Sequence, residues 1–380
     1  MFFEIIFWAS LGTLAYVFFG FVALLGIVAV FKQRPVGKRD ITPSVSVILC
    51  AFNEERHIRQ KIQNCLDLDY PKDRMEIIVV SDGSTDRTDA ILAELNEPLV
   101  RVHRLATQQG KTACQNAAAD MAKHEALFFT DATVMHPPES LKLLVRALAD
   151  PTVGCVTGRP VFKRDEGAAS LGQGKREKYE FFLRAKLGEA GTLFGAQDCM
   201  YAIPRQLYIP VRDDLDSGFV GPLQLLEKNY RTIYEPAAVA FIDRRPPTVY
   251  DEFARRSRIA LRGMRGLIYM RQLMNPSRHG FVAISLISTR LLRWLSPVFL
   301  LLLFAANLFL LRDPFYRFTF LLQAAFYLMA LAGYVMARRG HQLAMPLYIP
   351  LYFCVLACSA TVGLKRLLTG DTGQVWQTRR

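Results

Sequence analysis

The stretch SVSVILCAFNEE, residues 44–55, decides the fold of this chain. Its first seven residues are small or apolar, and the polar residues Asn53, Glu54 and Glu55 follow almost at once. A short apolar run of this kind is typical of a strand that is buried on both faces, as in a parallel sheet. The stretch therefore predicts a buried strand at 44–50 with a polar loop at its carboxyl end.

The same succession of strand, polar loop and helix continues along the chain. Further strands are expected at 76–81, 100–104, 126–130 and 153–158. Helices are expected at Glu54–Leu66, Asp86–Leu95, Lys111–Lys123 and Glu139–Leu148. This alternation predicts an α/β domain with a Rossmann-like, mostly parallel sheet covered on both faces. Ligands of such open sheets bind at the carboxyl ends of the strands.

The four loops at that edge are polar: AFNEE, DGSTDRT, QQGKTACQNAA and DATVMHP. One such loop alone could be a helix cap or a turn, but four on one edge indicate a ligand site. The third loop contains Gly110, Lys111 and Thr112, which resemble the end of an ATP-binding P-loop. That motif also needs a glycine five residues before Gly110, where this chain has Leu105. The fragment alone therefore does not indicate ATP.

Long apolar runs lie on either side of this domain. The run Ile5–Phe31 carries no charge and is long enough to cross about 30 Å of hydrocarbon. The basic segment KQRPVGKR follows it, which predicts a cytosolic flank and an N-terminus outside. The net charge of +13 suits a membrane face or a nucleotide ligand, and the basic residues crowd beside apolar segments. We therefore expect membrane lipids, and no nucleic acid, as partners.

The second half of the chain predicts further membrane segments. Arg290, Arg293 and Trp294 have the spacing of a helix that lies in the membrane interface. A spanning stretch is expected to begin at Pro297, with others after it; the last of them spans or is re-entrant. The expected division is a transmembrane helix at 1–32, a cytosolic domain at 40–250, basic interfacial helices at 251–296, transmembrane helices at 297–366 and a polar tail at 367–380.

The seven cysteines include no CxxC pair, so neither a disulfide framework nor a zinc site is expected.

Taken together, SVSVILCAFNEE, EIIVVSDGSTDRT, QGKTACQNAA and FFTDAT resemble family 2 glycosyltransferases, the inverting GT-A type. The resemblance extends from Ser44 to Gly263, and the terminal helices match the membrane-bound branch that makes polysaccharides or glycolipids. It implies a hexosyltransferase of the plasma (inner) membrane. The enzyme would move a sugar from a UDP-sugar to a lipid-linked or polysaccharide acceptor and form a β-linkage. Other synthase or export subunits are further partners that such a layout allows.

The resemblance also implies contacts to the donor. One loop would lie beside the base and ribose, an aspartate would accept a hydrogen bond from the uracil ring, and the Gly-Lys pair and an arginine would contact the diphosphate. The corresponding residues are, in that order, Phe52, Asn53 and Glu54; Asp82; Gly110 and Lys111; and Arg258.

The segment TDAT stands where the family has an Asp-x-Asp metal motif. Asp131 occupies the first carboxylate position and Thr133 the second, so Mg²⁺ or Mn²⁺ is the expected cofactor. His136 is a further, less favoured ligand, because hard cations prefer oxygen.

Inverting transfer needs a general base, which the family supplies from an acidic pair just before a helix. Counting back from Tyr230 without gaps places Gly218 at that position. A small insertion or deletion would restore Asp216 or Asp214, and Asp213 is also near. We favour Asp216 on position, while Asp214 fits the acidic pair and Asp198 is an outside candidate.

The segment RRSRIALRG departs from the Gln-x-x-Arg-Trp motif of processive synthases, because Ile259 replaces the tryptophan. The chain is therefore not expected to be highly processive. An alternative function is a catalytically weak, nucleotide-sugar-sensing subunit of a larger polysaccharide synthase. A nucleotidyltransferase would need a glycine-rich loop after the first strand, which AFNEERH lacks.

Overall fold

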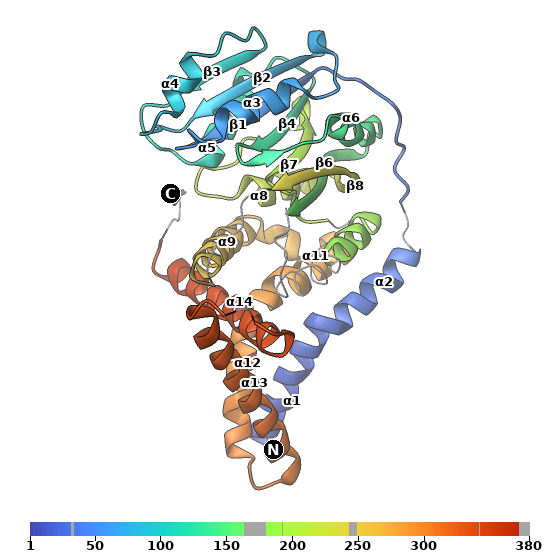
Figure 1. Cartoon of the computed structure of the whole chain (residues 1–380). Coiled ribbons are helices and arrows are strands. Elements are labelled where there is room, and N and C mark those ends of the chain that lie inside the picture. Colours follow the sequence, from blue (N-terminus) through green and yellow to red (C-terminus); the bar gives the residue numbers. More distant parts are fainter. Residues whose placement is uncertain (32–33, 163–179, 192, 243–248, 342, 372–380) are drawn as a thin grey trace. The chain divides into compact units, whose positions relative to one another are not determined.

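The computed structural model describes residues 1–31, 34–162, 180–191, 193–242, 249–341 and 343–371. The chain divides into two compact units (Figure 1). The sheet unit contains the described residues between 34 and 162 and between 187 and 242. The helical unit contains 1–31, 180–186 and the described residues from 249 to 371. Residues 180–186 thus group with the helical unit, although the limits expected from sequence enclose them in 40–250.

The sheet unit contains one sheet of eight strands in the order β3-β2-β1-β4-β7-β6-β8-β5 within the described residues. The strands are β1 (Val45–Ala51), β2 (Met75–Ser81), β3 (Val100–Arg104), β4 (Ala126–Asp131), β5 (Val134–Met135), β6 (Val153–Phe162), β7 (Met200–Pro204) and β8 (Arg231–Ile242). The predicted parallel sheet is confirmed for β3, β2, β1 and β4, which are all parallel neighbours. The other half is mixed, because β7 pairs antiparallel with both β4 and β6.

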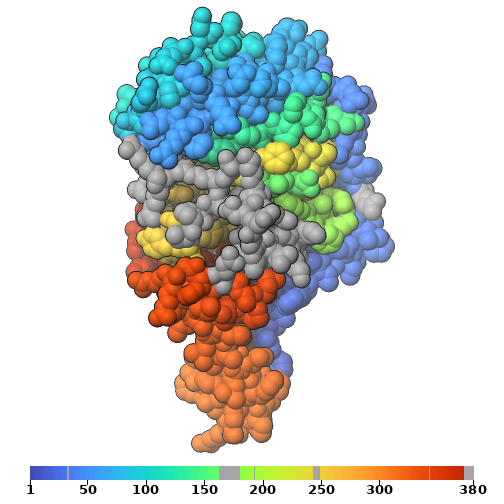
Figure 2. Space-filling view, in the orientation of Figure 1, coloured from blue at the N-terminus to red at the C-terminus, as the bar shows by residue number. Residues whose placement is uncertain are grey.

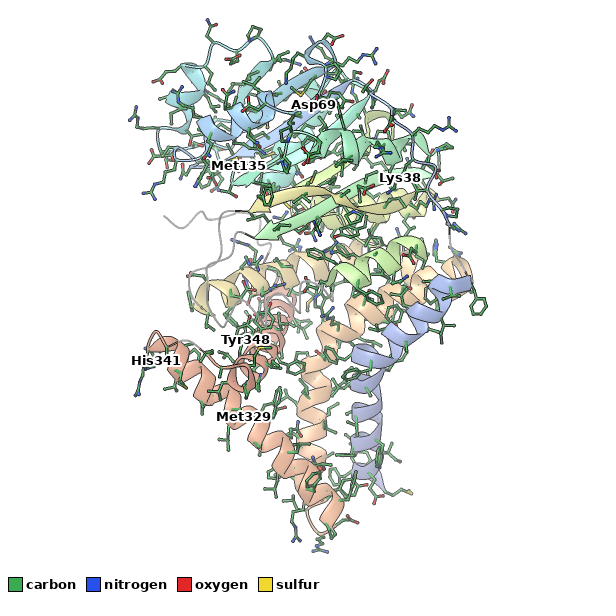
Figure 3. The ribbon with its side chains drawn as sticks, turned by 45° about the vertical axis from the view of Figure 1, so that its right-hand side comes forward. Lys38, Asp69, Met135, Met329, His341 and Tyr348 are labelled. Carbon is green, nitrogen blue, oxygen red and sulfur yellow. The ribbon has the colours of Figure 1, made fainter. Side chains whose placement is uncertain are left out.

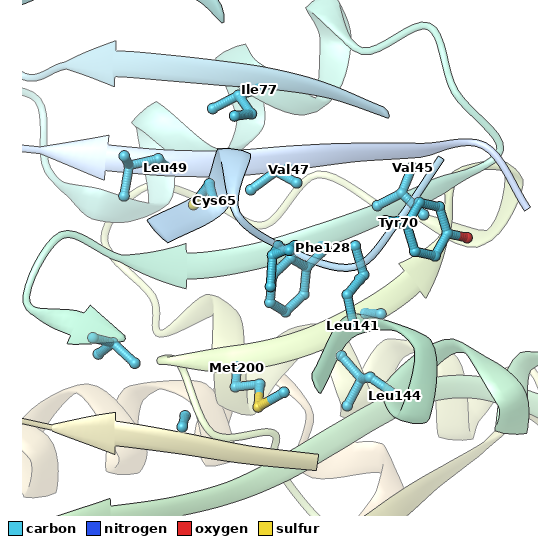
Figure 4. Close-up of a cluster of buried hydrophobic side chains, with 14 of the residues drawn as sticks. Val45, Val47, Leu49, Cys65, Tyr70, Ile77, Phe128, Leu141, Leu144 and Met200 are labelled. Carbon is cyan, nitrogen blue, oxygen red and sulfur yellow. The ribbon is translucent and has the colours of Figure 1, made fainter. Parts of the chain in front are cut away.

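The apolar run of β1 is explained by burial on both faces of the sheet. Val45, Val47 and Leu49 point to one face, whereas Ile48 and Cys50 point to the other. All seven residues of β1 are buried. Figure 4 shows the first of these faces, where the side chains of β1 pack with Phe128 and with residues of the flanking helices. Burying each large apolar side chain stabilises the fold by about 1.5–3 kcal/mol.

Helices cover both faces, as the alternation of elements predicted. Helices α3 (Ile58–Leu66) and α6 (Ser140–Val145) contribute to one apolar cluster, and α5 (Lys111–Met121) contributes to the other. Two further α-helices of this unit are α4 (Thr88–Ala93) and α8 (Ser217–Glu227). In the space-filling view, the segments that carry β1 to β4 form one continuous surface, coloured blue to teal (Figure 2).

Salt bridges tie the connecting segments of the sheet unit to its elements. Lys38 pairs with Glu235 of β8 at 2.6 Å, and Lys142 of α6 pairs with Asp69 at 2.7 Å. Lys38 and Asp69 are labelled in Figure 3.

The helical unit contains α1 (Phe2–Ala15) and α2 (Phe21–Phe31), joined by one π-helical turn. It continues with α9 (Val249–Tyr269), α10 (Pro276–His279), α11 (Phe281–Leu286), α12 (Leu292–Phe309), α13 (Pro314–Arg338) and α14 (Met345–Leu368). Among the described residues, four continuous helices are long and apolar enough to cross a membrane: Phe2–Phe31, Phe281–Phe309, Pro314–Arg338 and Met345–Leu368.

These helices differ from ordinary core helices in how little of their apolar surface is covered. In α13, only 11% of the most apolar 18-residue stretch is buried. Its side chains Phe318, Leu321 and Leu322 are each at least 60% exposed. Such exposure of large apolar side chains marks a surface that meets a membrane or another apolar partner.

One boundary differs from the prediction. The helix that carries Arg290 runs without a break through Pro297 to Phe309, so the stretch expected to lie in the interface is part of a candidate span. Trp294 packs against Gly263 of α9, where a methyl group would lie 2.6 Å from the indole ring. This glycine therefore permits the close approach of α9 and α12.

Candidate active site

The loops after β1 and β2 hold each other through side-chain hydrogen bonds to backbone. The side chain of Asn53 accepts a hydrogen bond from the backbone N–H of Thr85 at 2.8 Å. Ser84 and Thr88 accept from the backbone N–H groups of Asn53 and Glu54, at 3.2 and 2.8 Å. Asn53 has a φ of 52°, a left-handed conformation that asparagine tolerates better than most residues. Phe52 is partly exposed beside these residues.

Asp82 joins the second loop to the third. It is fully buried, and its two carboxylate oxygens accept hydrogen bonds from the backbone N–H groups of Gln109 and Gly110, at 2.7 and 2.9 Å. Gly83 allows this close approach, because a methyl group there would lie 2.8 Å from the backbone of Thr107 and Gln108. Asp82 thus shapes the Gly-Lys loop. Its expected hydrogen bond to a uracil ring stays a prediction.

Lys111 is the first residue of α5, and its ammonium group lies among acidic residues. Nζ of Lys111 is 2.5 Å from Oδ1 of Asp131 and 3.5 Å from the backbone oxygen of Asp198. Burial disfavours the ammonium form, but the negative charges of Asp131 and Asp198 outweigh that effect and raise the pKa of Lys111. The lysine is therefore a fixed positive charge at the N-terminus of a helix, where anions are also favoured.

The threonine of the same motif has a structural role. Oγ1 of Thr112 donates to the backbone oxygen of Leu215 at 2.8 Å, and Thr112 is buried. It thereby fixes α5 to the segment before α8. The fragment is thus unlike a P-loop in structure as well as in sequence, because the P-loop hydroxyl ligates a cation.

Asp131 and Thr133 lie at the carboxyl end of β4 and in the turn that follows it. The side chain of Asp131 is 30% exposed, and Thr133 is also partly exposed. The described residues contain no cluster of three or more histidine, cysteine or acidic residues that could hold a metal ion by themselves.

His136 is enclosed in the interior of the sheet unit. It is buried, and Nε2 lies 2.7 Å from Oγ1 of Thr130. Its backbone N–H donates to the side chain of Asn64 at 2.9 Å. Burial, together with the positive charge of Lys61, lowers the pKa of His136 well below its usual value. A neutral, enclosed imidazole with these partners is a packing residue, so the structure does not favour metal ligation by His136.

Lys61 is a residue near the site that the sequence did not single out. It lies on α3, is fully buried, and donates from Nζ to the backbone oxygen of Val134 at 2.5 Å. Burial lowers its pKa, whereas electrostatic interactions with Cys65 and Asp131 oppose that effect. A lysine in an amphipathic helix usually lies on the exposed face. Only its position on the buried face, with Ile58, Ile62 and Cys65, could have indicated this contact.

The three acidic residues before α8 each have a partner. Oδ1 of Asp216 caps α8 by accepting from the backbone N–H of Phe219 at 3.2 Å. Asp214 is buried and forms a two-point ion pair with Arg212, at 2.5 and 2.9 Å. Asp213 is exposed and accepts from the side chain of Asn116 at 3.2 Å. The assignment of a base to any one of them stays a prediction.

Arg258 belongs to the helical unit, on α9, whereas the other expected donor contacts belong to the sheet unit. Burial, followed by the positive charges of Arg262, Arg255 and Arg366, lowers the pKa of Arg258. Its expected contact with a diphosphate stays a prediction.

The described residues of the sheet unit thus bring together Phe52, Asn53, Glu54, Asp82, Gly110, Lys111 and Asp131 at one edge of the sheet, as expected from the parallel strands. The chain resembles in fold the mannosyltransferase PcManGT from Pyrobaculum calidifontis, solved in complex with GDP-Man and Mn2+, with a TM-score of 0.70 and 20% sequence identity. The alignment covers 95% of this chain and 98% of that one. The fold is therefore that of a GT-A glycosyltransferase with additional apolar helices.

Sequence comparison gives the family. Residues 46–208 match the model for Glycosyl transferase family 2. Residues 46–208 therefore form a family 2 glycosyltransferase domain.

Curated relatives agree with this assignment. The probable glycosyltransferase YdaM of Bacillus subtilis is 34% identical over 125 residues, which is 31% of this chain and 29% of that protein. The beta-monoglucosyldiacylglycerol synthase of Synechocystis is 30% identical over 187 residues, or 46% of this chain and 39% of that one. The poly-beta-1,6-N-acetyl-D-glucosamine synthase of Staphylococcus aureus is 23% identical over 222 residues, or 56% and 52%. The matched region spans about half or less of the length of these relatives.

Proposed function

We propose that this protein transfers a sugar from a UDP-sugar to a lipid-linked or polysaccharide acceptor at a membrane, with inversion at the anomeric carbon and formation of a β-linkage. The observation that carries the proposal is Lys111 beside Asp131, at the carboxyl edge of the sheet in a family 2 domain. This pair supplies a cation for a diphosphate and a carboxylate for a divalent metal ion within 2.5 Å of each other.

On the donor side, the diphosphate would lie near the ammonium group of Lys111, at the beginning of α5. A lysine and a helix N-terminus both favour phosphate oxygens. The base and ribose would lie beside Phe52, Asn53 and Glu54. This loop forms hydrogen bonds with the loop that follows Asp82. Arg258 is proposed as a further contact to the diphosphate.

The residues at the end of β4 fit a divalent cation. Asp131 is partly exposed, and Thr133 offers a hydroxyl two residues later. Mg²⁺ binds through one or two carboxylates together with substrate phosphates and water, and Mn²⁺ favours the same oxygen ligands. Asp131 and Thr133 would therefore hold Mg²⁺ or Mn²⁺ with the diphosphate. When bound, the cation neutralises charge on the departing UDP.

On the acceptor side, the names of two relatives indicate a glycolipid and a polysaccharide product respectively. The four apolar helices found among the described residues favour an acceptor that is attached to or dissolved in the membrane. Ile259, at the position of the tryptophan that supports the glycan in processive synthases, favours few transfers per binding event.

A donor screen tests this function. Detergent-solubilised protein would be incubated with UDP-glucose, UDP-N-acetylglucosamine, UDP-galactose and GDP-mannose, with diacylglycerol in the micelles, and release of UDP or GDP measured with Mn²⁺ or Mg²⁺. We expect acceptor-dependent release from one UDP-sugar. Tight UDP binding without release from any donor would contradict transfer and would favour the nucleotide-sensing alternative.

A multi-pass arrangement in the plasma (inner) membrane is part of the proposal, with the N-terminus outside and Gly37 to Arg278 in the cytosol. Nucleotide sugars are expected there, so the exposed Arg87 should be reached by a thiol reagent only from the cytosolic side when it is changed to cysteine. Labelling of Arg87→Cys from outside intact cells would overturn the orientation.

A further inference from the structure

A tight turn places Asp198 at a fixed point of the sheet unit. Residues 198 and 199 form the tip of the turn, which is closed by a bridge between Gln197 and Met200. The backbone N–H of Gln197 donates to Oγ1 of Thr157 on β6 at 2.7 Å, and that of Met200 donates to the backbone oxygen of Gln197 at 2.8 Å. These bonds hold the turn against the sheet, so the Asp198 side chain projects from a rigid support.

The Asp198 carboxylate lies in the space that a side chain of residue 218 would occupy. A methyl group built on Gly218 would lie 1.7 Å from Oδ1 of Asp198 and 2.8 Å from its Cγ. The backbones of the two segments are also joined, because the N–H of Ala196 donates to the backbone oxygen of Gly218 at 2.7 Å. Position 218 is the one at which the family resemblance expects the base. A carboxylate is therefore present at that place, although it comes from another segment.

Asp198 also lies near the charged edge of the sheet, through its backbone. Nζ of Lys111, which lies 2.5 Å from Asp131, is 3.5 Å from the backbone oxygen of Asp198. Asp198 as a residue is partly exposed, whereas its Oδ1, the oxygen beside position 218, is buried. By contrast, Asp216 caps α8, and Asp214 is buried against Arg212.

We propose that Asp198 is the general base of the transfer reaction and that it replaces, from the turn at 197–200, the side chain that Gly218 lacks. This inference rests on the proposed function and names the residue that completes its chemistry.

In the step that follows from this assignment, an acceptor hydroxyl attacks the anomeric carbon of the donor sugar. A carbon–oxygen bond forms on one face while the bond to the β-phosphate oxygen of UDP breaks on the other, and its electron pair leaves with UDP. The hydroxyl proton passes to the Asp198 carboxylate, directly or through one water, and is later released to solvent.

The first test is Asp198→Asn, which keeps the size and turn preference of the residue but removes the base. With the best UDP-sugar of the donor screen and diacylglycerol as acceptor, we expect kcat to fall at least about a hundredfold. The affinity for UDP, measured by calorimetry, should stay within about twofold of the parent, because a base acts on the acceptor and not on the nucleotide. Turnover close to that of the parent, or a loss of UDP affinity equal to the loss of turnover, would overturn the assignment.

The second test exchanges the two positions. Gly218→Asp alone should destabilise the protein, because the new side chain overlaps the Asp198 carboxylate. The double variant Asp198→Gly with Gly218→Asp removes that overlap and supplies a carboxylate from α8. We expect the turnover of the double variant to be at least about tenfold higher than that of Asp198→Gly alone. A folded double variant with no recovery would contradict a shared catalytic position.

The outcomes separate this inference from the proposed function. Turnover of the parent protein tests the function, whereas the ratio of variant to parent tests Asp198. A parent that binds UDP but transfers no sugar would overturn both, because a base has no role without the reaction.

Discussion

The two halves of the sheet unit build the candidate site in different ways. In the half formed by β1 to β4, parallel strands end at a common edge, and the loop that follows each strand brings its own polar residues. In the half that contains β7, the sheet is mixed, and residues from separate segments meet, as Asp198 and Gly218 do. A site of the first kind follows from the order of motifs along the chain. A site of the second kind depends on contacts between distant segments, which local sequence patterns do not predict.

The largest loss of turnover is expected for a substitution of Asp131, which lies at the end of β4 in the parallel half of the sheet. Asp131→Asn removes the carboxylate proposed to hold the cation and leaves Lys111 without its ion-pair partner. We expect turnover to fall about a thousandfold, the upper end for losing one electrostatic group. UDP release in Mn²⁺ and in chelator measures this effect.

Asp69→Asn is the matched control for that variant. Asp69 is an exposed aspartate paired with Lys142, and surface pairs contribute about 0–1 kcal/mol. Its turnover should equal that of the parent. If the parent itself is equally active in chelator and in Mn²⁺, the metal assignment at Asp131 is wrong.

A smaller effect is expected where one loop of the parallel half supports another. Asp82→Ala leaves the backbone N–H groups of Gln109 and Gly110 without their acceptors. Each unsatisfied buried group costs about 1–3 kcal/mol, so the Gly-Lys loop should lose its shape. We expect the Kd for UDP to rise at least about a hundredfold in a protein that still folds, as calorimetry and a melting curve would determine.

Ser84→Ala removes a single acceptor in the same region and serves as the control for Asp82. It should weaken UDP binding far less. Normal UDP affinity in folded Asp82→Ala protein would count against the proposed donor site as a whole.

The smallest effect is expected at Asp216, in the half with the mixed sheet. Because Asn caps helices as well as Asp does, Asp216→Asn should keep turnover within about threefold of the parent. Asp216→Ala should lower the free energy of unfolding by about 0.5–2 kcal/mol through loss of the cap. A loss of turnover of about a hundredfold in Asp216→Asn, with UDP binding unchanged, would return the base to Asp216.

The sequence predicted the parallel half well because a buried strand and the loop after it are continuous in the chain. The strands at 44–50, 76–81, 100–104 and 126–130 agree with β1 to β4 to within a few residues. The sequence also placed Lys111 and Asp131 at the same edge of the sheet, although β3 and β4 are not neighbouring strands and their ion pair was not predicted.

The remaining features could not be predicted in this way. Lys61 lies on the buried face of an amphipathic helix, where a lysine is unusual. The hydrogen bonds of Asp82 to a neighbouring loop depend on the close approach that Gly83 permits. The position of Asp198 beside Gly218 joins the turn at 197–200 to α8 through a backbone hydrogen bond from Ala196, so it emerges only from the folded chain.

The ion pair between Lys111 and Asp131 has a consequence for how the binding of one ligand affects the binding of the other. A cation alone would compete with Lys111 for the Asp131 carboxylate, and a nucleotide alone would compete with Asp131 for the ammonium group. A nucleotide diphosphate that arrives with its cation supplies a new partner to each residue, so the two ligands should reinforce one another. By thermodynamic linkage, the factor by which Mn²⁺ tightens UDP binding must equal the factor by which UDP tightens Mn²⁺ binding. The domain would thus hold the complete metal–nucleotide complex more firmly than the separate affinities of its components would give.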